Sequence, residues 1–545
     1  MKILIKNGQI IDGTGSPGYK ADVLINGDRI ERINEEISVE DAEIIDASGK
    51  IVTPGFIDIH NHADFNIYDV NRAESFVMQG MTTLLVGLCG TGIAPANKVV
   101  EEYYADFGKK AFSIEPKLYP KLEDCLVDLK KKGVSLNLAF LVPQGNVRGC
   151  VMGLDMRPAT DDELEKMKDL VRNGMEAGAF GLSTGLVYPP GSATPIEELI
   201  ELSKVVAEYD GIYDSHMRNE GAKVLDVGMA EVIRIAREAK VKAHISHWSV
   251  ISRYKIENLT ANAIKMFRDA LDEGLKMTAD VVPYDDGVTS LPFVILESWV
   301  FENFAENLTK PETRKRIKDE IFQRIFAIFL AGAPWYLKLI PKFIIKRLMP
   351  PVIAKQVVLL HTTSGEFNGK TLYEALKIRY PDSKMLDALL DFMRDEEGGI
   401  VIRIQFKDEE RSVIPLLKQP FACVSSDAVF IPRANNHPRT FSAFPRVIER
   451  IVREKNWMSL EEAVKKITSL PATILGIPDR GVLKEGKAAD IVVFDYDKIR
   501  EMATFANGNQ HPEGIDYVIV NGKITVEKGE HLGVLGGQIL KHESN

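Results

Sequence analysis

Five side chains that bind metal ions well lie at equivalent places in this sequence, each at the end of a short apolar run. His60 and His62 follow GFIDI, Cys89 follows TLLVGL, and His216 and His247 close the runs GIYDSH and VKAHISH. Imidazole and thiolate donors together favour zinc over magnesium or calcium. A single histidine in such a place is usually an ordinary polar residue, but chance does not put five donors in equivalent places. The pattern predicts a zinc site.

A carboxylate occupies the same kind of position, because Asp427 closes the run FACVSSD. Hydrolysis by a zinc-activated water needs a carboxylate to accept the proton of the water and to deliver it to the leaving nitrogen. The alternative role for Ser425-Ser426-Asp427 is a helix N-cap. Beside five metal-type residues we favour the catalytic role for Asp427.

Neighbouring residues offer alternatives to this set. His244 lies three residues before His247 in the same run, so the two face opposite sides of a strand. We prefer His247 as the ligand because it lies at the end of the run. His437, in HPRTF, is expected in a loop on the same rim, where it could touch substrate. The remaining cysteines lack the glycine turn that follows Cys89 and are interpreted as core residues: Cys125, Cys150 and Cys423.

Eight apolar runs that alternate with helical stretches predict the strands that carry these residues. Alternation of this kind is typical of βα units around a parallel sheet, and eight units over some 400 residues fit a (β/α)8 barrel with insertions. All strands of a barrel end on one rim, which would bring the metal-type residues together. The main rival is a doubly wound open sheet, but no GxGxxG-type turn is present. The eight runs are 55–60, 83–89, 137–142, 179–184, 211–216, 241–247, 276–284 and 421–427.

Both ends of the chain are rich in predicted hairpins. The first fifty residues, and again GVLKEGKAADIVVFD and DYVIVNGKITVEKGE, alternate apolar residues with Asn-Gly and similar turns. We therefore predict one small β-sandwich domain built from residues 1–54 and 471–545, which flank a catalytic barrel at 55–470.

Composition limits the classes of function. The 545 residues carry 68 Lys+Arg against 78 Asp+Glu, a net charge of −10, which gives no general attraction for nucleic acid. Four cysteines without a CxxC pair do not form a disulfide framework. The N-terminus, MKILIKNGQIIDG, lacks the apolar core of a signal peptide. We expect a cytoplasmic protein.

An apolar, basic insertion is expected at about 300–360, and its most apolar part is 321–353. The longest charge-free run there, Ile325 to Leu337, has 13 residues, short of the roughly 20 that a spanning helix needs. The four prolines of the stretch are expected to break it further. A helical hairpin packed on the domain or against a second copy of the chain is the favoured interpretation. A lid over the active site and a membrane-surface anchor are the alternatives.

Motifs along nearly the whole chain resemble the metal-dependent amidohydrolase superfamily and, within it, the N-acyl-D-amino-acid deacylases (D-aminoacylases). Residues 300–360 show the least resemblance. The stretches that carry it are GFIDIHNHAD (55–64), GLSTGLVYPPGSAT (181–194), DSHMRNEG (214–221), HISH (244–247), DVVPYDDGVTS (280–290), SSDA (425–428), HPRTFSAFPRV (437–447) and GVLKEGKAADIVVFD (481–495).

The resemblance implies roles for particular residues. It implies a tight zinc ion held by Cys89, His216 and His247, and a weaker second metal held by His60 and His62 with Cys89 bridging. Contacts with the substrate carboxylate are implied for Tyr188, Tyr284 and Arg439, and the planar fork of an arginine suits that role. Hydantoinase-type relatives use a carboxylated lysine on the fourth strand, whereas AFGLSTGLVYPPG contains no lysine.

Four places depart from the pattern of the relatives and put the choice of substrate in doubt more than metal binding. They are Leu88, Pro143-Gln144-Gly145, Trp248-Ser249 and the acidic pair Asp285-Asp286. The favoured function is zinc-dependent hydrolysis of the N-acyl amide of an N-acyl-D-amino acid. A cyclic-amide hydrolase or a deaminase with the same metal core is the alternative. A non-enzymatic binding module is disfavoured because every expected metal and acid position is filled.

Overall fold

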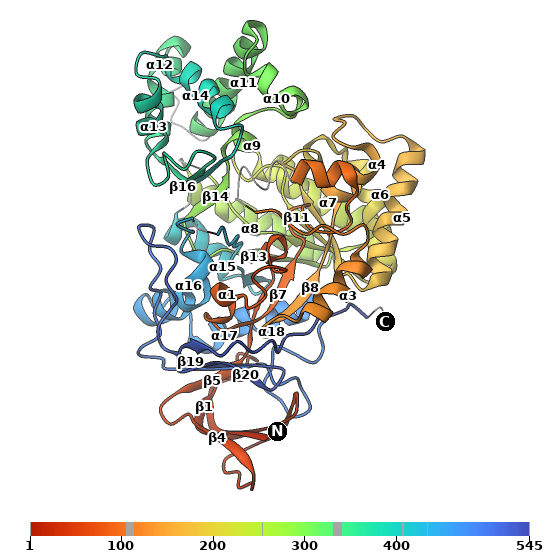
Figure 1. Ribbon diagram of the computed structural model, residues 1–545, viewed down its shortest axis with the longest axis vertical. Helices are drawn as coiled ribbons and strands as arrows, with labels where there is room; N and C mark the ends of the chain where they lie inside the picture. Colours follow the sequence, from red (N-terminus) through yellow and green to blue (C-terminus); the bar gives the residue numbers. More distant parts are fainter. Residues whose placement is uncertain are drawn as a thin grey trace.

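The structure is a computed structural model that describes residues 2–104, 114–252, 254–330, 340–405, 408–432 and 434–543. It contains three parts, stacked along the long axis in Figure 1: a β-rich part at the bottom, an α/β barrel in the middle and a lobe at the top.

The predicted (β/α)8 barrel is confirmed. Parallel pairing joins neighbouring strands in two runs, β6-β7-β8 and β9-β10-β11-β12-β13-β17. A parallel bridge between Asn61 and Ala428 closes the ring between its first and last strands. The strands are β6 (Phe56–Asp58), β7 (Met81–Val86), β8 (Asn137–Phe140) with β9 (Val142–Pro143), β10 (Gly181–Gly185), β11 (Ile212–His216), β12 (Lys242–Ile245), β13 (Met277–Val281) and β17 (Ala422–Val424).

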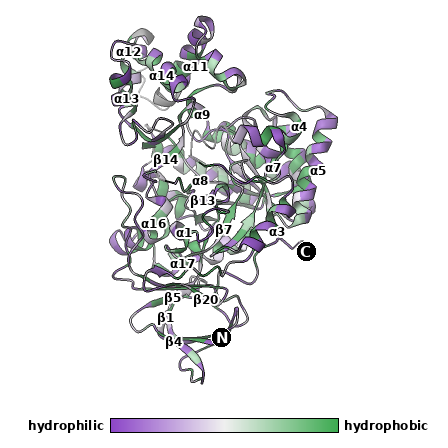
Figure 2. Ribbon diagram, in the orientation of Figure 1, coloured by the Kyte–Doolittle hydropathy of each residue, from purple (hydrophilic) through white to green (hydrophobic). Residues whose placement is uncertain are grey.

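Amphipathic helices cover the outside of the barrel. Helix α5 begins at a capping box in which the Thr160 hydroxyl accepts from the Glu163 amide and the Glu163 carboxylate accepts from the Thr160 amide. In Figure 2 its outer face is largely hydrophilic, while the barrel strands are hydrophobic. The helices are α1 (Glu74–Val77), α3 (Leu122–Lys132), α4 (Gln144–Met152), α5 (Asp161–Ala177), α6 (Ile196–Glu208), α7 (Ala230–Ala239), α8 (Ile256–Asp272), α15 (Ile414–Leu417), α16 (Arg439–Arg446), α17 (Leu460–Ile467) and α18 (Ser469–Leu475).

The β-rich part joins the two ends of the chain in one nine-stranded sheet. The junction is the antiparallel pair β5–β18, which aligns Ile51 with Phe494. Figure 1 shows this sheet bent into two layers, and its isoleucines and valines form a core of their own. The strands are β1 (Lys2–Ile10), β2 (Tyr19–Asn26), β3 (Arg29–Asn34), β4 (Ala42–Asp46), β5 (Ile51–Pro54), β18 (Ile491–Phe494), β19 (Ile515–Val520), β20 (Lys523–Glu527) and β21 (Glu530–His531).

The lobe is inserted between β13 and β17 and is wider than the insertion expected at 300–360. It begins with β14 and ends with β16, which pair antiparallel, so the chain leaves the barrel and returns to it at the same place. Its apolar residues form a core separate from that of the barrel. Its elements are β14 (Asp286–Ser290), α9 (Leu291–Ile295), α10 (Phe304–Asn307), α11 (Pro311–Leu330), α12 (Lys342–Ala354), β15 (Val357–Thr362), α13 (Leu372–Arg379), α14 (Met385–Asp395) and β16 (Ile400–Gln405).

The stretch 321–353 falls mostly in α11 and α12, and its residues 331–339 lie outside the described part of the chain. Phe322 of α11 packs with Ile345 and Met349 of α12, so the two helices share a small apolar cluster. The expectation that prolines break this stretch is wrong for Pro350 and Pro351, which lie inside α12. Proline removes one helical hydrogen bond but its φ angle is helical, so a helix can continue through it. Among the described residues, no helix has both the length and the apolar character that crossing a bilayer needs.

Candidate metal centre

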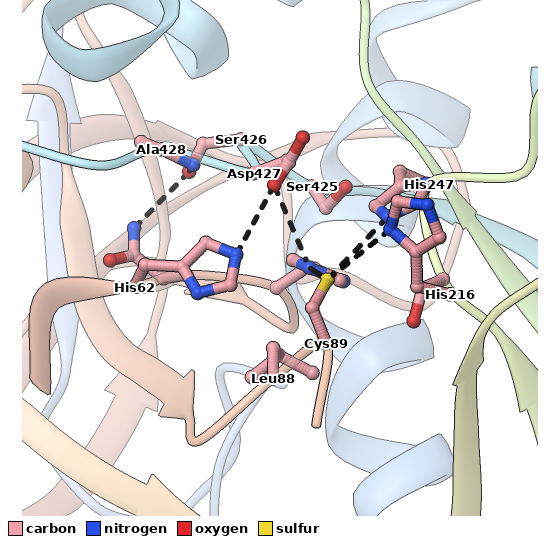
Figure 3. Close-up of polar contacts among 12 residues, drawn as sticks. His62, Leu88, Cys89, His216, His247, Ser425, Ser426, Asp427 and Ala428 are labelled. Atoms are coloured by element: carbon pink, nitrogen blue, oxygen red, sulfur yellow. Dashed lines mark hydrogen bonds and ion pairs between the residues drawn. The ribbon is translucent and has the colours of Figure 1, made fainter. Parts of the chain in front are cut away.

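The metal-type residues predicted from the sequence converge at the carboxyl ends of the barrel strands. Cys89 lies at the centre, with His216 and His247 on one side and His62 and Asp427 on the other (Figure 3). Except for His216, the last residue of β11, these residues lie two to four residues beyond the strands rather than at their final positions. The strands are therefore shorter than the apolar runs suggest, and turns aim the side chains.

The distances around Cys89 are those of a set of metal ligands. Its Sγ lies 3.3 Å from His60 Nε2, 3.6 Å from His216 Nδ1 and 3.7 Å from His247 Nε2. On the other side of His60, Asp427 Oδ1 is 3.6 Å from His60 Nε2 and 3.4 Å from His62 Nε2. The structure thus brings together all five predicted ligands and the predicted acid–base.

Three residues of the centre have left-handed backbone conformations. The φ angles are +52° for Cys89, +32° for His247 and +47° for Asp427. Such a conformation costs a non-glycine residue roughly 1–3 kcal/mol and persists only where the surroundings impose it. For Asp427 the backbone amide donates to the His60 carbonyl (2.9 Å), and for His247 it donates to Asp280 Oδ1 (2.9 Å). These turns place the side chains over the rim, and no sequence signal predicted them.

Cys89 differs from the other cysteines in charge. Burial raises the pKa of its thiol, but the histidines around it, His60 first, outweigh burial and hold the pKa well below 9.0. For Cys423, inside the barrel on β17, burial raises the pKa well above 9.0. Because the thiolate is the form that binds metal, Cys89 is the cysteine whose surroundings suit the predicted ligand role.

Asp427 is held ionised by its neighbours. Burial raises its pKa, but the Arg439 guanidinium, at 2.9 Å from Oδ2, and His62 lower it well below 3.8. Arg439 is buried and lies in the first turn of α16. A carboxylate at this place can accept a proton from a water bound beside the ligands.

Two carboxylates that support the ligands were not predicted. Glu220 Oε1 lies 3.0 Å from His247 Nδ1, and Asp280 lies 3.7 Å from His60 Nδ1 and 3.0 Å from His244 Nε2. His244 is thus turned away from Cys89, as its spacing from His247 predicts. Carboxylates behind metal-binding histidines fix their tautomer and orientation. Both lie within the motifs DSHMRNEG and DVVPYDDGVTS, but neither ends a strand, so the pattern of strand-end residues does not include them.

The three residues predicted to contact the substrate carboxylate do not all lie together. Arg439 and Tyr188 line the cavity above the centre, and the Tyr188 ring packs against His216 with centroids 4.9 Å apart. Tyr284 is outside the cavity lining; its hydroxyl donates to Glu501 (3.1 Å) and the Arg446 guanidinium stacks on its ring. The structure therefore does not bring Tyr284 to the others.

Asp286 of the acidic pair at 285–286 has a structural explanation. Buried Asp286 pairs with Arg403 (2.6 Å) of β16 and lies 3.0 Å from His437 Nε2. His437 Nδ1 accepts from the Arg439 amide (3.1 Å), so Nε2 carries the proton and donates to Asp286. His437 therefore links the start of α16, next to Arg439, to β14, the first strand of the lobe.

Of the other departures, Ser249 lines the cavity, whereas Leu88, Trp248 and Gln144 lie behind the rim. Leu88 packs in the apolar interior of the barrel, and Trp248 packs among aromatic rings, 5.0 Å from that of Phe267. Gln144 donates to the Thr194 hydroxyl (3.0 Å). None of the three lines the cavity.

A cavity of about 1200 Å³ opens above the centre. Its floor contains five residues of the centre: His62, Cys89, His216, His247 and Asp427. Tyr188 and Arg439 form the wall next to the floor, and the rest comes from barrel loops, including residues 218–223, and from the lobe. The ligands are therefore accessible to a bound molecule.

The donor set fits zinc. Zinc bonds of about 2.0–2.3 Å in a tetrahedron separate ligand atoms by about 3.5 Å, and the distances from Cys89 Sγ to three histidine nitrogens have this size. The ligand atoms of His60, Cys89 and His247 lie within 4.8 Å of one another, and so do those of His60, His62 and Asp427. One thiolate and four imidazoles favour zinc over a hard cation.

Comparisons with known proteins agree with this geometry. The sequence pattern of the Amidohydrolase family matches residues 43–286 and 413–526. A D-aminoacylase of Alcaligenes xylosoxydans xylosoxydans is 28% identical over 99% of this chain and 97% of its own length. An N-acyl-D-glutamate deacylase of the same organism is 29% identical over 96% and 93%.

The solved structures include a close match in fold. An N-acyl-D-glutamate deacylase from Bordetella bronchiseptica, complexed with zinc and a phosphonate inhibitor that mimics the tetrahedral intermediate, superposes with a TM-score of 0.79. It is 29% identical, and the match covers 99% of both chains. The chain described here belongs to the Amidohydrolase family.

Proposed function

We propose that this protein is a zinc-dependent hydrolase that cleaves the amide bond of N-acyl-D-amino acids into a carboxylate and a free D-amino acid. The observation that carries the proposal is the ring of Cys89 and four histidines beside an ionised carboxylate at the floor of an open cavity. Relatives named as deacylases of D-amino acids support the substrate class, since they align over nearly the whole chain.

Cys89, His216 and His247 would hold a tight zinc ion, and His60 and His62 would hold a weaker second one with Cys89 between them. Zinc in such a site polarises the scissile carbonyl and lowers the pKa of a bound water to about 7. Glu220 and Asp280 keep the imidazoles of His247 and His60 in place behind the ligands.

Asp427 performs the proton transfers. Its Oδ1 faces the histidine ligands and accepts the proton of the attacking water, while Oδ2 remains paired with Arg439. The same carboxyl then delivers the proton to the departing nitrogen, so the leaving group is a neutral amine. Arg439, buried at the cavity wall, also places a positive charge where the carboxylate of the substrate can bind.

The test measures zinc per chain and amine release from paired N-acyl-D- and N-acyl-L-amino acids that carry an acetyl or a decanoyl group. Zinc near one per chain or above, with release from the D enantiomer, is the expected result. A zinc-loaded protein that releases amine from neither enantiomer would overturn the proposal and would point to a cyclic amide or a deamination, which the same ligands can serve.

A further inference from the structure

The cavity above the metal centre does not end at the barrel rim but extends into the lobe. The same continuous cavity is lined by Cys89 and Asp427 at its floor and by Leu372, Leu376 and Leu389 on helices α13 and α14. All three leucines belong to the buried core of the lobe. The lobe is therefore hollow on the side that faces the metal ligands, and we refer to this part of the cavity as the apolar arm.

The walls of the apolar arm are largely apolar. They come from β14, α9, α12, β15, α13, α14 and β16 and include Val288, Leu291, Ile353, Leu386 and Val401. Besides the charged side chains at its edge, the polar side chains that the lobe contributes are Thr289, Ser290 and Gln356. Charged side chains at its edge are paired with each other, Arg324 with Glu297 (2.6 Å) and Arg411 with Asp408 (2.7 Å). Such a wall favours an uncharged, flexible hydrocarbon and offers few polar groups to orient a polar ligand.

The volume is too large for a small N-acetyl substrate. Pockets of about 300–1,000 Å³ enclose molecules of drug size, and this cavity, at about 1200 Å³, exceeds that range. An N-acetyl amino acid would occupy only the floor, where the ligands, Tyr188 and Arg439 lie. Unless another part of the substrate fills the apolar arm, a large hydrophobic surface would stay wetted during the reaction.

We propose that the apolar arm binds the hydrocarbon tail of a medium- or long-chain fatty acyl group, so that the preferred substrates are N-fatty-acyl-D-amino acids. The inference rests on the proposed function, because the scissile amide must lie over the metal ligands. The acyl chain rather than the amino-acid side chain occupies the apolar arm, because the carboxylate next to that side chain is drawn to Arg439 at the floor. The acyl chain is also the part of an N-acyl-D-amino acid whose length can vary by many methylenes.

The position of the apolar arm in the sequence agrees with a specificity device. The family pattern matches residues up to 286 and resumes at 413, which leaves out the lobe and with it most of the arm. The metal ligands and Asp427 lie inside the matched segments. The shared chemistry therefore lies in the barrel, and the family pattern leaves the sequence of the lobe, which would select the acyl chain, unconstrained.

The first experiment measures kcat/KM for one D-amino acid, D-leucine, carrying acetyl, butanoyl, hexanoyl, octanoyl, decanoyl or tetradecanoyl groups. Each methylene that enters the apolar arm should raise kcat/KM by roughly three- to fourfold until the arm is filled. Values that stay flat or fall from acetyl to decanoyl would overturn the inference and leave the proposed function intact. A larger rise in kcat/KM per methylene when the alkyl chain is lengthened on the amino-acid side chain instead of the acyl group would also overturn the inference.

Variants that fill the apolar arm make the test specific. Ala354→Phe and Leu386→Trp place rings in the arm from α12 and α14, and each should lower the ratio of decanoyl to acetyl kcat/KM at least tenfold. Two matched variants on the exposed surface of the lobe, Ala305→Phe and Leu348→Trp, should leave that ratio unchanged. A ratio that stays unchanged in both filled variants, confirmed as folded by circular dichroism, would overturn the inference.

A binding measurement separates this inference from the proposed function. Calorimetric titration of the zinc-loaded protein with decanoate should show binding that Ala354→Phe weakens at least tenfold and Ala305→Phe does not. If no N-acyl-D-amino acid is hydrolysed, the proposed function fails, while decanoate binding with this variant pattern still supports an apolar arm for fatty chains. If decanoate does not bind, the inference fails whatever the enzyme hydrolyses.

Discussion

The barrel floor and the lobe differ in almost every physical respect, although they enclose one cavity. The floor is polar: a thiolate, three imidazoles and the carboxylate of Asp427 line it, and the buried side chains of His60 and Asp280 lie within a few ångströms of them. The lobe contributes aliphatic side chains and a core of its own. The family pattern covers the floor and omits the lobe.

This difference separates two tasks. Bond cleavage needs a few groups at distances fixed to within tenths of an ångström, so the floor is built from strained turns and buried hydrogen bonds. Selection by hydrophobic contact is non-directional and depends on area, so many different apolar surfaces can perform it. We therefore expect substitutions at the floor to abolish turnover, and substitutions in the lobe to change which acyl chain is accepted.

The largest effect is expected at Asp427. Asp427→Asn removes the proton acceptor while keeping the shape of the side chain, so kcat for an N-acetyl-D-amino acid should fall by roughly 10³–10⁴-fold. Zinc content should stay at the parent value, measured by plasma mass spectrometry on the purified variant. Because Asp427 also lies 3.4 Å from His62 Nε2, a parallel loss of zinc would make it a ligand instead.

Cys89→Ala should lower zinc content and turnover together, because it removes the thiolate shared by the two halves of the centre. The matched control is Cys423→Ala, which removes a buried thiol inside the same barrel. It should keep its zinc and lose about 1 kcal/mol of folding free energy, which is the cost of a small cavity. Metal analysis after dialysis checks both, and zinc retained by Cys89→Ala would break the assignment.

Arg439→Lys is expected to lower kcat/KM by about ten- to a hundredfold, since lysine cannot reproduce the planar fork of the guanidinium. Arg439 helps to hold the pKa of Asp427 below its usual value, so weakening the pair should move the acid limb of the pH–kcat profile to higher pH. A change in KM alone, with the acid limb unmoved, would assign Arg439 to the substrate carboxylate and not to Asp427.

A smaller effect is expected where the two regions meet. Asp286→Asn removes the charge that holds Arg403 of β16 and His437 together, and should cost about 2 kcal/mol of folding free energy at pH 7. Burial raises the pKa of Asp286, but His437 and Arg403 outweigh it and the folded-state pKa lies below 3.8.

The sign of its pH dependence follows from this lowered pKa. The stabilisation is fully present above the unfolded pKa near 4 and is lost as pH falls through the folded pKa. Thermal unfolding should therefore separate parent and variant clearly at pH 7 and progressively less below pH 4. A separation that grows toward acid pH would contradict the ion pair.

The smallest effect on turnover is expected in the lobe core. Leu390→Ala leaves a cavity beside but not in the apolar arm, and should cost roughly 2–5 kcal/mol locally while changing N-acetyl turnover by less than about twofold. Hydrogen exchange should accelerate within residues 286–405 and not in the barrel. The same change in the barrel, Leu182→Ala, should reduce both turnover and the protection of barrel amides from hydrogen exchange. Equal effects of Leu390→Ala and Leu182→Ala on turnover would show that the lobe and the barrel do not differ in this respect.

The sequence by itself determined the barrel and the set of predicted ligands. Apolar runs of strand length, separated by helices with capping boxes such as Thr160–Glu163, limit the chain to a parallel α/β fold, and the strand ends of such a fold share one rim. Residue type then selects zinc, since Cys89 and four histidines cannot be mistaken for a site of oxygen ligands. These signals are local in the chain, so they can be read without coordinates.

The tertiary structure decided the features that depend on contacts between residues distant in the chain. The left-handed turns at Cys89, His247 and Asp427, the support from Glu220 and Asp280, and the departure of Tyr284 toward Glu501 depend on partners distant in the chain. The hollow of the lobe depends on how α12, α13 and α14 pack, since the same leucines would fill a solid core with equal hydropathy. Hydrophobicity specifies that a side chain is buried, and only packing specifies what it is buried against.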